Sequence, residues 1–550
     1  MGDDAHDNIT SGDYNVAIGD SAGVSLTNGS FTTFLGWGAG HGNTATENVF
    51  IGYKSGYGNT MDTDNTFVGA ETGKVNDGND NTFIGTQAGR DNTTGYDNTF
   101  VGEEAGETNT TGDNNVFIGE DAGHSATEAD DNVFIGASAG YTGGTHASGS
   151  QVIDPWILDY ASQWTATGGG ESNVAVGADA LWDIQSGTMN TAVGAGAGGD
   201  VGAGNGNTFV GGEAGINTES GDHNTFIGTL SGWDNNRTNN TANANDNTYV
   251  GFMAGYTNRE GVNNVGMGAF ADFMSNSGSN RNVFIGSELD VRGNDITMLG
   301  NHGYVYADKV VSLGANHWVR GTAGIGLGYA VNLSVDADYA ISIGFEAQNT
   351  ALNSIGLGRN HIASGEASIV IGANSSVSGA NSIALGTDLD LTAANTVFIG
   401  NAATTSIGGT VNWTATSDAR MKTAVRQDVP GLLFIKALRP VTYNYDAATL
   451  LAQFGGPADL MSEKNDMRFT GFLAQEVAEV AAGMGYDFCG VDVPTDETQV
   501  YGIRYGAFVV PLVQAVQELS QLVERQGQLI LDQQAALEAF VASQSADLKD

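Results

Sequence analysis

A short glycine-containing motif recurs along most of the 550-residue chain, and it constrains the fold more than any other feature. One copy reads Asn-Thr-Phe-Ile-Gly-Thr-Gln-Ala-Gly over residues 81–89. The glycine that closes the aliphatic-Gly step occurs 23 times, mostly every 16 or 17 residues up to Gly286 and mostly every 14 residues from there to Gly400. This period is too short for a helix–turn–helix unit and fits one coil of two short strands and two turns.

Stacked coils of this kind predict a parallel β-solenoid or β-roll. The stretch between strands is rich in Asn, Asp, Thr and Gly, and Asn and Gly tolerate the positive φ of tight corners. Neighbouring strands lie about 4.8 Å apart, so the repeat predicts a rod on the order of 110 Å long. We expect 17-residue repeats over 1–140 and 173–290, an aromatic loop insertion over 141–172, and 14-residue repeats over 291–413.

Side chains alternate between the two faces of each predicted strand. In the strand 116–118, Val116 and Ile118 share one face and Phe117 takes the other. Because the first face is aliphatic or Thr in nearly every repeat, we interpret it as the filling of the coil. The phenylalanines would then form an outer column that a neighbouring chain buries, since soluble monomers rarely expose so large an apolar patch. The alternative is a broad coil whose interior admits both faces.

Two segments of the 14-residue region resemble the head repeats of YadA-type trimeric autotransporter adhesins. They read Asn-Ser-Ile-Gly-Leu-Gly at 353–358 and Asn-Ser-Ile-Ala-Leu-Gly at 381–386. The resemblance covers roughly residues 290–410 and implies a left-handed parallel β-roll with three chains around one axis. The membrane β-barrel anchor of those adhesins has no counterpart in this sequence, so we expect a different delivery system.

Two segments interrupt the repeat. The insertion 141–172 contains Trp156, Tyr160 and Trp164 with carboxylates nearby, a combination that could stack on sugar rings and bind a host receptor. Insertions in solenoids often lie on the binding face. The alternative is a small core that braces the rod. The shorter insertion 233–247 is rich in Asn and is interpreted as a solvated loop.

Composition excludes several classes of protein. The chain has 63 acidic and 20 basic residues, and its formal net charge of −43 disfavours nucleic acid as a partner. A single cysteine, Cys489, argues against a disulfide framework and a Cys-based zinc site. No run approaches 18 consecutive apolar residues, so no membrane insertion is expected. No cofactor is expected either, although acidic turns such as 77–80 and 130–131 could take Ca²⁺ or another divalent cation.

The composition changes after Gly400. Residues 418–550 hold half of the basic residues of the chain but only 18 of its 63 acidic ones. Three motifs in this region resemble, in order, those of the S74 or endosialidase-type intramolecular chaperone of phage tail fibres and tailspikes. They are Ser-Asp-Ala-Arg-Met-Lys at 417–422, Gly-Phe-Leu-Ala-Gln-Glu-Val at 471–477 and Ala-Val-Gln-Glu-Leu at 515–519. The resemblance covers 414–550 and implies a trimeric folding clamp that cuts itself from the finished fibre.

The resemblance also implies a catalytic pair. In that family a Ser and a Lys five residues later form a dyad, which places Ser417 and Lys422 in these roles, with Asp418 and Arg420 as supporting residues. Lysine activates a serine hydroxyl when desolvation or a cationic neighbour lowers the pKa of its amine. Ser417 could attack the carbonyl of Thr416 to give an ester that water cleaves, whereas the family cuts at the Ser-Asp junction. The scissile bond therefore stays open within 416–418. The alternative for these residues is helix capping.

The last segment predicts a coiled coil over about 510–545. Its seam residues alternate in steps of four and three. They are Leu512, Val516, Leu519, Val523, Gln526, Ile530, Gln533, Leu537 and Phe540. The two glutamines could fix register or oligomer state, and the family resemblance implies three strands. Parallel coils slip easily, so a C-terminal trimeriser would hold the register while the rod forms.

Together these observations predict a homotrimeric phage tail fibre that binds a host-surface glycan or protein and contacts other tail proteins of the virion. Its only enzymatic activity would be a single self-cleavage. Virion docking would fall to another fibre protein or to a preceding segment, because the repeat begins by Asn15. The alternatives are a polysaccharide-degrading tailspike with paired carboxylates, a calcium-binding solenoid, a non-viral trimeric adhesin or structural fibre, and an ice-binding solenoid. The last is disfavoured because Thr66, Thr82 and Thr99 are assigned to the coil-filling face and form no Thr-x-Thr row.

Overall fold

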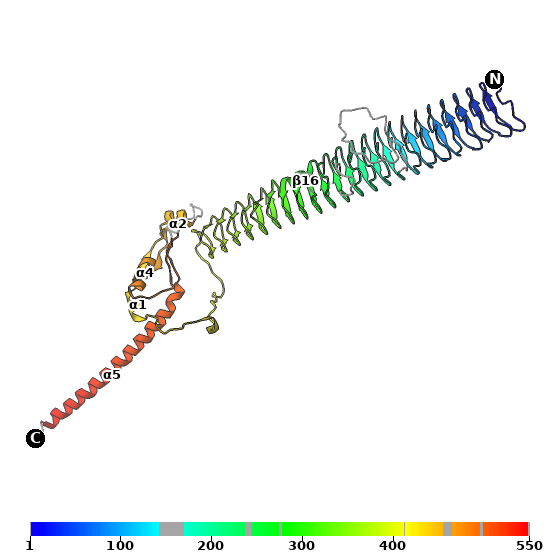
Figure 1. Cartoon of the computed structure of the whole chain (residues 1–550). Coiled ribbons are helices and arrows are strands. Elements are labelled where there is room, and N and C mark those ends of the chain that lie inside the picture. Colours follow the sequence, from blue (N-terminus) through cyan, green and yellow to red (C-terminus); the bar gives the residue numbers. More distant parts are fainter. Residues whose placement is uncertain are drawn as a thin grey trace. The chain divides into compact units, whose positions relative to one another are not determined.

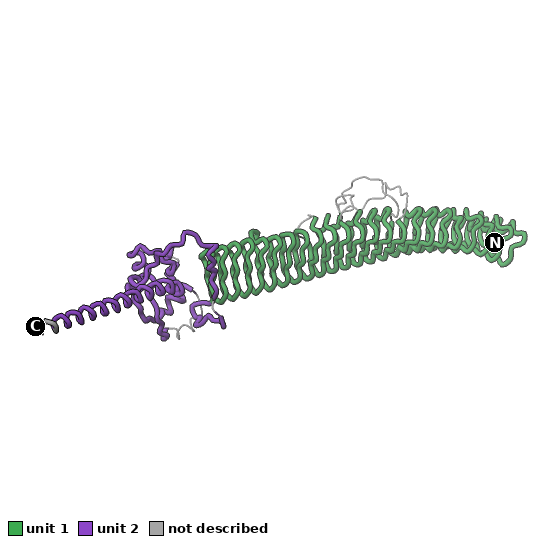
Figure 2. The backbone as a smooth tube through the Cα atoms, turned by 90° about the horizontal axis from the view of Figure 1, so that it is seen from below, with its two compact units in different colours: residues 1–399 green, residues 400–550 purple. Residues whose placement is uncertain are grey.

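The computed structural model describes residues 2–141, 170–236, 244–273, 278–411, 413–454, 465–495 and 499–547. The chain divides into two compact units, Met1–Ile399 and Gly400–Asp550, which Figure 2 colours separately.

The first unit is a stack of β-coils (Figure 1). Its strands form one 30-stranded sheet in which each coil pairs in parallel with the next. The register keeps equivalent residues opposite one another, as in Thr82↔Thr99 and Phe83↔Phe100. The ladder also continues across the insertion 141–172, because the strand at Val133–Ile135 pairs directly with the strand at Val174–Val176. The predicted parallel β-solenoid is therefore confirmed.

Strands in the 17-residue coils are only three residues long, shorter than the expected five. Each of these coils has one regular strand, except the last, which has both β14 and β15. The bounds are β1 Val16–Ile18, β2 Thr33–Leu35, β3 Val49–Ile51, β4 Thr66–Val68, β5 Thr82–Ile84, β6 Thr99–Val101, β7 Val116–Ile118, β8 Val133–Ile135, β9 Val174–Val176, β10 Thr191–Val193, β11 Thr208–Val210, β12 Thr225–Ile227, β13 Thr248–Val250, β14 Val265–Met267 and β15 Ala271–Phe273.

The following coils carry longer or paired strands, so that two ladders run along this part of the rod. The bounds are β16 Val283–Arg292, β17 Thr297–Tyr306, β18 Val311–Ala315, β19 Trp318–Val319, β20 Ile325–Tyr329, β21 Asn332–Leu333, β22 Ile341–Phe345, β23 Gln348–Asn349, β24 Ile355–Leu357, β25 Ile362–Ala363, β26 Ile369–Ile371, β27 Ser376–Val377, β28 Ile383–Leu385, β29 Asp390–Leu391 and β30 Val397–Ile399.

The predicted assignment of the strand faces was wrong, because the phenylalanines fill the coils. Phe83 is fully buried, whereas the following Ile84 is 40 % exposed. Room for the ring comes from Gly89, where an added Cβ would lie 2.4 Å from a ring carbon of Phe83. Successive rings stack inside the rod, with centroids 4.7 Å apart for Phe83 and Phe100. The buried column is Phe34, Phe50, Phe67, Phe83, Phe100, Phe117 and Phe134.

The same reversal changes the position of the threonine row. Thr66, Thr82 and Thr99 face outward and are half-buried instead of filling the coil. The outward position two residues further on is aliphatic in each of these strands, so no Thr-x-Thr row forms. The alternative in which the coil interior admits both faces is also excluded for these strands, because only their middle residue is fully buried.

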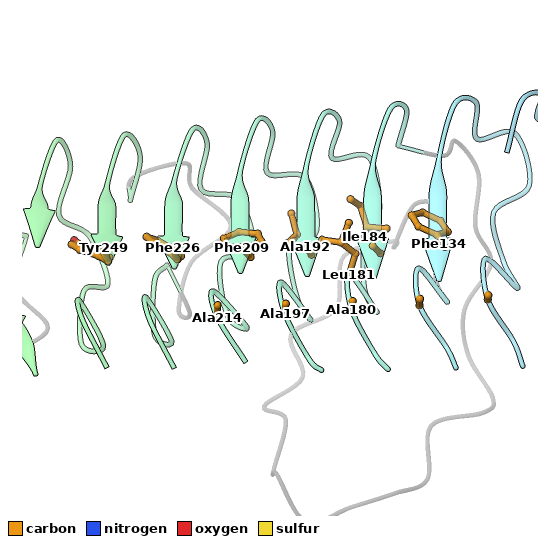
Figure 3. Packing of buried hydrophobic residues seen from close by; sticks show 14 of the residues in the cluster. Phe134, Ala180, Leu181, Ile184, Ala192, Ala197, Phe209, Ala214, Phe226 and Tyr249 are labelled. Atoms are coloured by element: carbon orange, nitrogen blue, oxygen red, sulfur yellow. The ribbon is translucent and has the colours of Figure 1, made fainter. Parts of the chain in front are cut away.

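One pair of coils replaces the aromatic core by aliphatic side chains. Ala175 and Ala192 occupy the strand position at which other coils have phenylalanine. Leu181 occupies the turn position at which other coils have the glycine equivalent to Gly89, and Figure 3 labels it together with Ala192. All three are fully buried. Leu181 has a φ of +49°, close to the φ of +57° at the equivalent Gly89. The Leu181 side chain on the facing turn thus fills the volume that a phenylalanine ring on the strand fills in other coils, as close packing requires.

An asparagine before each strand joins neighbouring coils from within. The backbone N–H of Asn115 donates to Oδ1 of Asn98 at 2.9 Å, and Nδ2 of Asn98 donates to the carbonyl of Gly112 at 2.8 Å. Asn98 is fully buried. The pattern repeats in coil after coil, which explains why Asn precedes so many strands. The repeat pattern by itself indicated only that these asparagines suit tight turns.

Replacing Asn98 by Ala should destabilise the rod by about 1–3 kcal/mol, because it leaves the buried N–H of Asn115 without a partner and removes one of the two side-chain hydrogen bonds to the Gly112 carbonyl. The measurement is the unfolding rate in guanidinium, followed by circular dichroism. Thr94→Ala, at an exposed position of the preceding coil, is the control and should change the rate little. Equal rates for the two variants would contradict the structural role of the ladder.

The Asp200 carboxyl makes the stability of the rod fall as the pH rises. Burial raises the pKa of Asp200 to about 8, and the charges of Asp183 and Glu219 act in the same direction. The folded state therefore keeps a proton that the unfolded state releases above about pH 4, so stability falls as the pH rises from about 4 to about 8. We expect Asp200→Asn to stabilise the rod by about 1–3 kcal/mol at pH 8.5 and by little at pH 4. Parallel pH series of unfolding rates test this, and a constant difference between the two proteins would contradict it.

The second unit is a small α+β domain that ends in a long helix. Its core contains Phe434, Val477, Phe488 and Phe508. Two antiparallel strand pairs, β31–β32 and β33–β34, support it. The bounds are η1 Ala419–Met421, α1 Leu432–Ala437, β31 Val441–Tyr443, α2 Ala447–Phe454, β32 Phe469–Gly471, α4 Ala474–Gly483, β33 Val491–Asp492, β34 Gly502–Ile503, η3 Tyr505–Phe508 and α5 Val509–Asp547.

Helix α5 exposes the apolar seam that the heptad pattern defines. Val516, Val523 and Ile530 are each 59–60 % exposed. The helix is confirmed, and the coiled coil stays a prediction. By length and composition alone, the stretch Tyr505–Gln544 also passes for a membrane span, and 17 % of its apolar window is buried. One such helix is weak evidence, so the expected absence of membrane insertion also stays a prediction.

Candidate functional site

A single 3₁₀ turn forms the candidate catalytic site. Asp418 begins the turn η1, and its Oδ1 accepts a hydrogen bond from the backbone N–H of Arg420 at 2.9 Å. The turn brings Lys422 back over Ser417, and Lys422 Nζ donates to Ser417 Oγ at 2.6 Å. The helix-capping interpretation therefore applies to Asp418, and the cap positions the Ser–Lys pair.

Arg420 pairs with the capping carboxylate. Its Nε and Nη2 lie 3.0 and 2.6 Å from Oδ2 of Asp418. These hydrogen bonds lower the pKa of Asp418, so the carboxylate remains charged and keeps the cap at neutral pH. Arg420 thus neutralises Asp418 and braces the turn.

The site is open to water in a single chain. Thr416, Ser417, Arg420 and Lys422 are all exposed. A hydroxyl in contact with an amine has the geometry for nucleophilic catalysis, because the amine can accept the hydroxyl proton once it is itself neutral. Desolvation favours the neutral form of a lysine amine, so burial of this pair by further protein would promote the reaction.

The motifs that follow Lys422 in the sequence lie together around the core of this domain. Arg439 forms a bidentate ion pair with Glu476 of the central motif. The Tyr505 hydroxyl accepts a hydrogen bond from the backbone N–H of Phe472 at 3.2 Å. Glu518 accepts a hydrogen bond from the backbone N–H of Leu432 at 2.8 Å and so ties α5 to α1. Sequence reasoning identified the motifs but not these partners, which lie 33 to 86 residues apart.

The other predicted sites have different outcomes. Trp156, Tyr160 and Trp164 lie outside the described residues, so the receptor site stays a prediction. In the acidic turns, Asp77 accepts hydrogen bonds from the backbone N–H and hydroxyl of Thr60, and Asp130 accepts one from the N–H of Asp113. These carboxylates join neighbouring coils, and cation binding by them remains untested.

Among the described residues, one group has the geometry of metal ligands. Glu104, Glu107 and His124 place ligand atoms within 4.8 Å of one another. His124 Nε2 lies 2.7 Å from Glu107 Oε2, and the Arg90 guanidinium contacts the other oxygen of Glu107. The cluster is therefore an ion-pair network in which a cation would have to compete with Arg90.

Comparison with known families gives a match in the second unit. Residues 417–486 match the family model described as the chaperone of endosialidase, Peptidase S74. No curated protein matches the chain. The match begins at Ser417 and includes the Ser–Lys pair, the Arg439–Glu476 pair and helix α4. Residues 417–486 are thus a domain of the endosialidase chaperone family.

Proposed function

We propose that this protein is a homotrimeric phage tail fibre or tailspike whose C-terminal domain assembles the fibre and then cuts itself off near Ser417. The observation that carries the proposal is the 2.6 Å contact between Ser417 and Lys422 at the first residue of the chaperone-family match. The β-solenoid that precedes this domain provides a rod for it to assemble.

The proposed reaction is an intramolecular acyl transfer. Lys422 takes the proton of the Ser417 hydroxyl while Oγ attacks the carbonyl carbon of Thr416. The peptide bond between them breaks as its nitrogen takes the proton from Lys422 and becomes the free amine of Ser417, and an ester joins Thr416 to Oγ. Water then hydrolyses the ester, which leaves the Thr416 carboxylate and restores the hydroxyl. Cleavage at the Ser417–Asp418 bond is the other option within the segment.

The exposure of the site links cleavage to assembly. In one chain the Lys422 side chain is exposed to water. Neighbouring copies that cover η1 would desolvate the amine and make it a base. The clamp would then remain attached until the chains have come together, and its removal would make the rod kinetically resistant to unfolding.

Expression of the full chain tests the proposal. We expect a fragment of about 133 residues on a denaturing gel and a rod that sediments as three copies. A full-length chain that stays intact and sediments as one copy would overturn the proposal.

Host binding is the remaining part of the proposed role, with the virion tail as the location and a cell-surface glycan or protein as the receptor. Glycan arrays and whole-cell adsorption with the cleaved rod test it, and deletion of 141–172 tests the proposed receptor site. Release of reducing sugars from host glycans would instead favour a polysaccharide-degrading tailspike. Adsorption to surfaces in the absence of any virion would favour an adhesin or structural fibre.

A further inference from the structure

An uncharged stripe of aliphatic residues and threonines runs along the outside of the rod, on the strands that Figure 1 shows as a row of arrows. It consists of the first and third residues of each coil's leading strand, which flank the buried middle residue. The first position is Val, Thr or Ile in every coil, from Val16 to Val397. The third position is Ile, Leu, Val or Met in every coil, from Ile18 to Ile399. We call this surface the strand stripe.

The strand stripe is accessible to solvent in a single chain. Ile18, Ile118 and Ile227 are 51, 38 and 40 % exposed in the 17-residue coils. Leu313 and Ile371 are 37 and 43 % exposed in the later coils. None of the stripe positions is charged, although 15 % of the chain's residues are. Conformational preference for strands does not explain this, because an outward strand position in water accepts Lys or Glu at little cost.

The size of the strand stripe indicates an interface. Coils stack about 4.8 Å apart over a rod of about 110 Å, and two outward residues span about 7 Å, so the surface covers on the order of 800 Å². Apolar patches on soluble monomers rarely exceed a few hundred Å². A stable protein–protein interface buries about 800 Å² on each partner.

We propose that the strand stripe is the surface through which copies of this chain contact one another, side by side, in parallel and in register. This inference rests on the self-association in the proposed function and names the surface that performs it. It replaces the outer phenylalanine column, which the structure places inside the coils.

Three features identify a second copy as the occupant. The strand stripe repeats with the spacing of the coils, and another copy of the same rod has a matching repeat. The same chain ends in α5, whose exposed heptad seam favours parallel association of helices. The rod is strongly acidic, so an interface between copies must be free of charge, which the stripe is.

Symmetry then predicts which residues meet. Parallel copies around one axis turn the same surface toward that axis, so each stripe residue approaches its own equivalent. Ile118 should therefore lie near Ile118 of the other copies. Because all coils look alike along the stripe, the interface alone fixes register weakly, and a register set from the C-terminal end is needed.

Cysteine cross-linking in the full chain tests this arrangement. Cys489 is first replaced by Ser, since it is exposed. Ile118→Cys and Val250→Cys then place single thiols on the stripe, and Thr111→Cys places one at an exposed position outside it. Circular dichroism checks that each variant folds. Mild oxidation followed by a non-reducing gel shows covalent dimers, and maleimide labelling measures thiol accessibility.

We expect dimers and slow labelling for both stripe cysteines, and fast labelling without dimers for Thr111→Cys. Co-expression of Ile118→Cys and Val176→Cys chains with different tags should give no mixed dimer, because these positions lie two coils apart. Fast labelling of both stripe cysteines in a chain that sediments as an assembly would overturn the inference and leave the proposed self-association standing. Protection without dimers would also overturn it, because another molecule would then cover the stripe. A chain that sediments as a single copy would overturn both.

Discussion

Replacing Ser417 by Ala should abolish self-cleavage, so that only the full-length chain appears on a denaturing gel. The hydroxyl is the only group at this position that can form the ester, and Lys422 contacts it directly at 2.6 Å. Loss of the nucleophile removes the reaction, whereas the Asp418 cap and the fold of η1 do not depend on the hydroxyl. We therefore expect the uncut variant to assemble like the parent protein.

Substitutions of the base separate chemistry from structure. Lys422→Arg keeps the positive charge beside Ser417, but arginine stays protonated and cannot accept the hydroxyl proton, so cleavage should also be lost. Thr414→Ala removes a nearby exposed hydroxyl and should cut normally. If the Ser417→Ala chain still releases a fragment of about 133 residues, the assignment of the nucleophile is wrong.

Replacing Phe100 by Ala should destabilise the rod by about 3–5 kcal/mol, because it removes a fully buried ring from the middle of a stack. The ring lies 4.7 Å from both neighbouring rings, measured between centroids. Partial collapse of one coil cannot fill the gap, since the neighbouring coils hold their spacing through the sheet ladder. The unfolding rate in guanidinium should rise more than tenfold.

The chain itself supplies a compensating substitution. An added Cβ at Gly106 would lie 2.5 Å from the Phe100 ring, so the ring and the glycine share one volume. The coil of Ala175 shows the opposite solution, with Leu181 at the glycine position and a φ of +49° against +58° at Gly106. Phe100→Ala combined with Gly106→Leu should therefore recover part of the loss, whereas Gly106→Leu alone should clash. A double variant no more stable than Phe100→Ala would show that these positions do not compensate each other.

The sequence predicted the parallel β-solenoid correctly, but the prediction of which strand face points inward was wrong. The spacing of the glycines reveals the coils, because each coil needs a glycine at the same position of its turn. Alternation alone cannot tell inside from outside when both faces are apolar, as in Val116, Phe117 and Ile118. The structure decides it through Gly123, since a Cβ there would lie 2.5 Å from the Phe117 ring. The facing turn, and not the strand, thus sets which residue points inward.

In the candidate site too, some features follow from the order of residues and others only from contacts in three dimensions. The sequence by itself determined the coil period, the change of composition after Gly400 and the spacing of Ser417 and Lys422, because these depend on order along one chain. Only the tertiary structure decided that the phenylalanines are buried and that Asp418 caps the turn which closes the Ser–Lys pair. It also decided that Arg439 meets Glu476 and that the aliphatic residues face water. Each of these depends on atoms brought together across turns or coils, and a pattern along the sequence does not give the distances between such atoms.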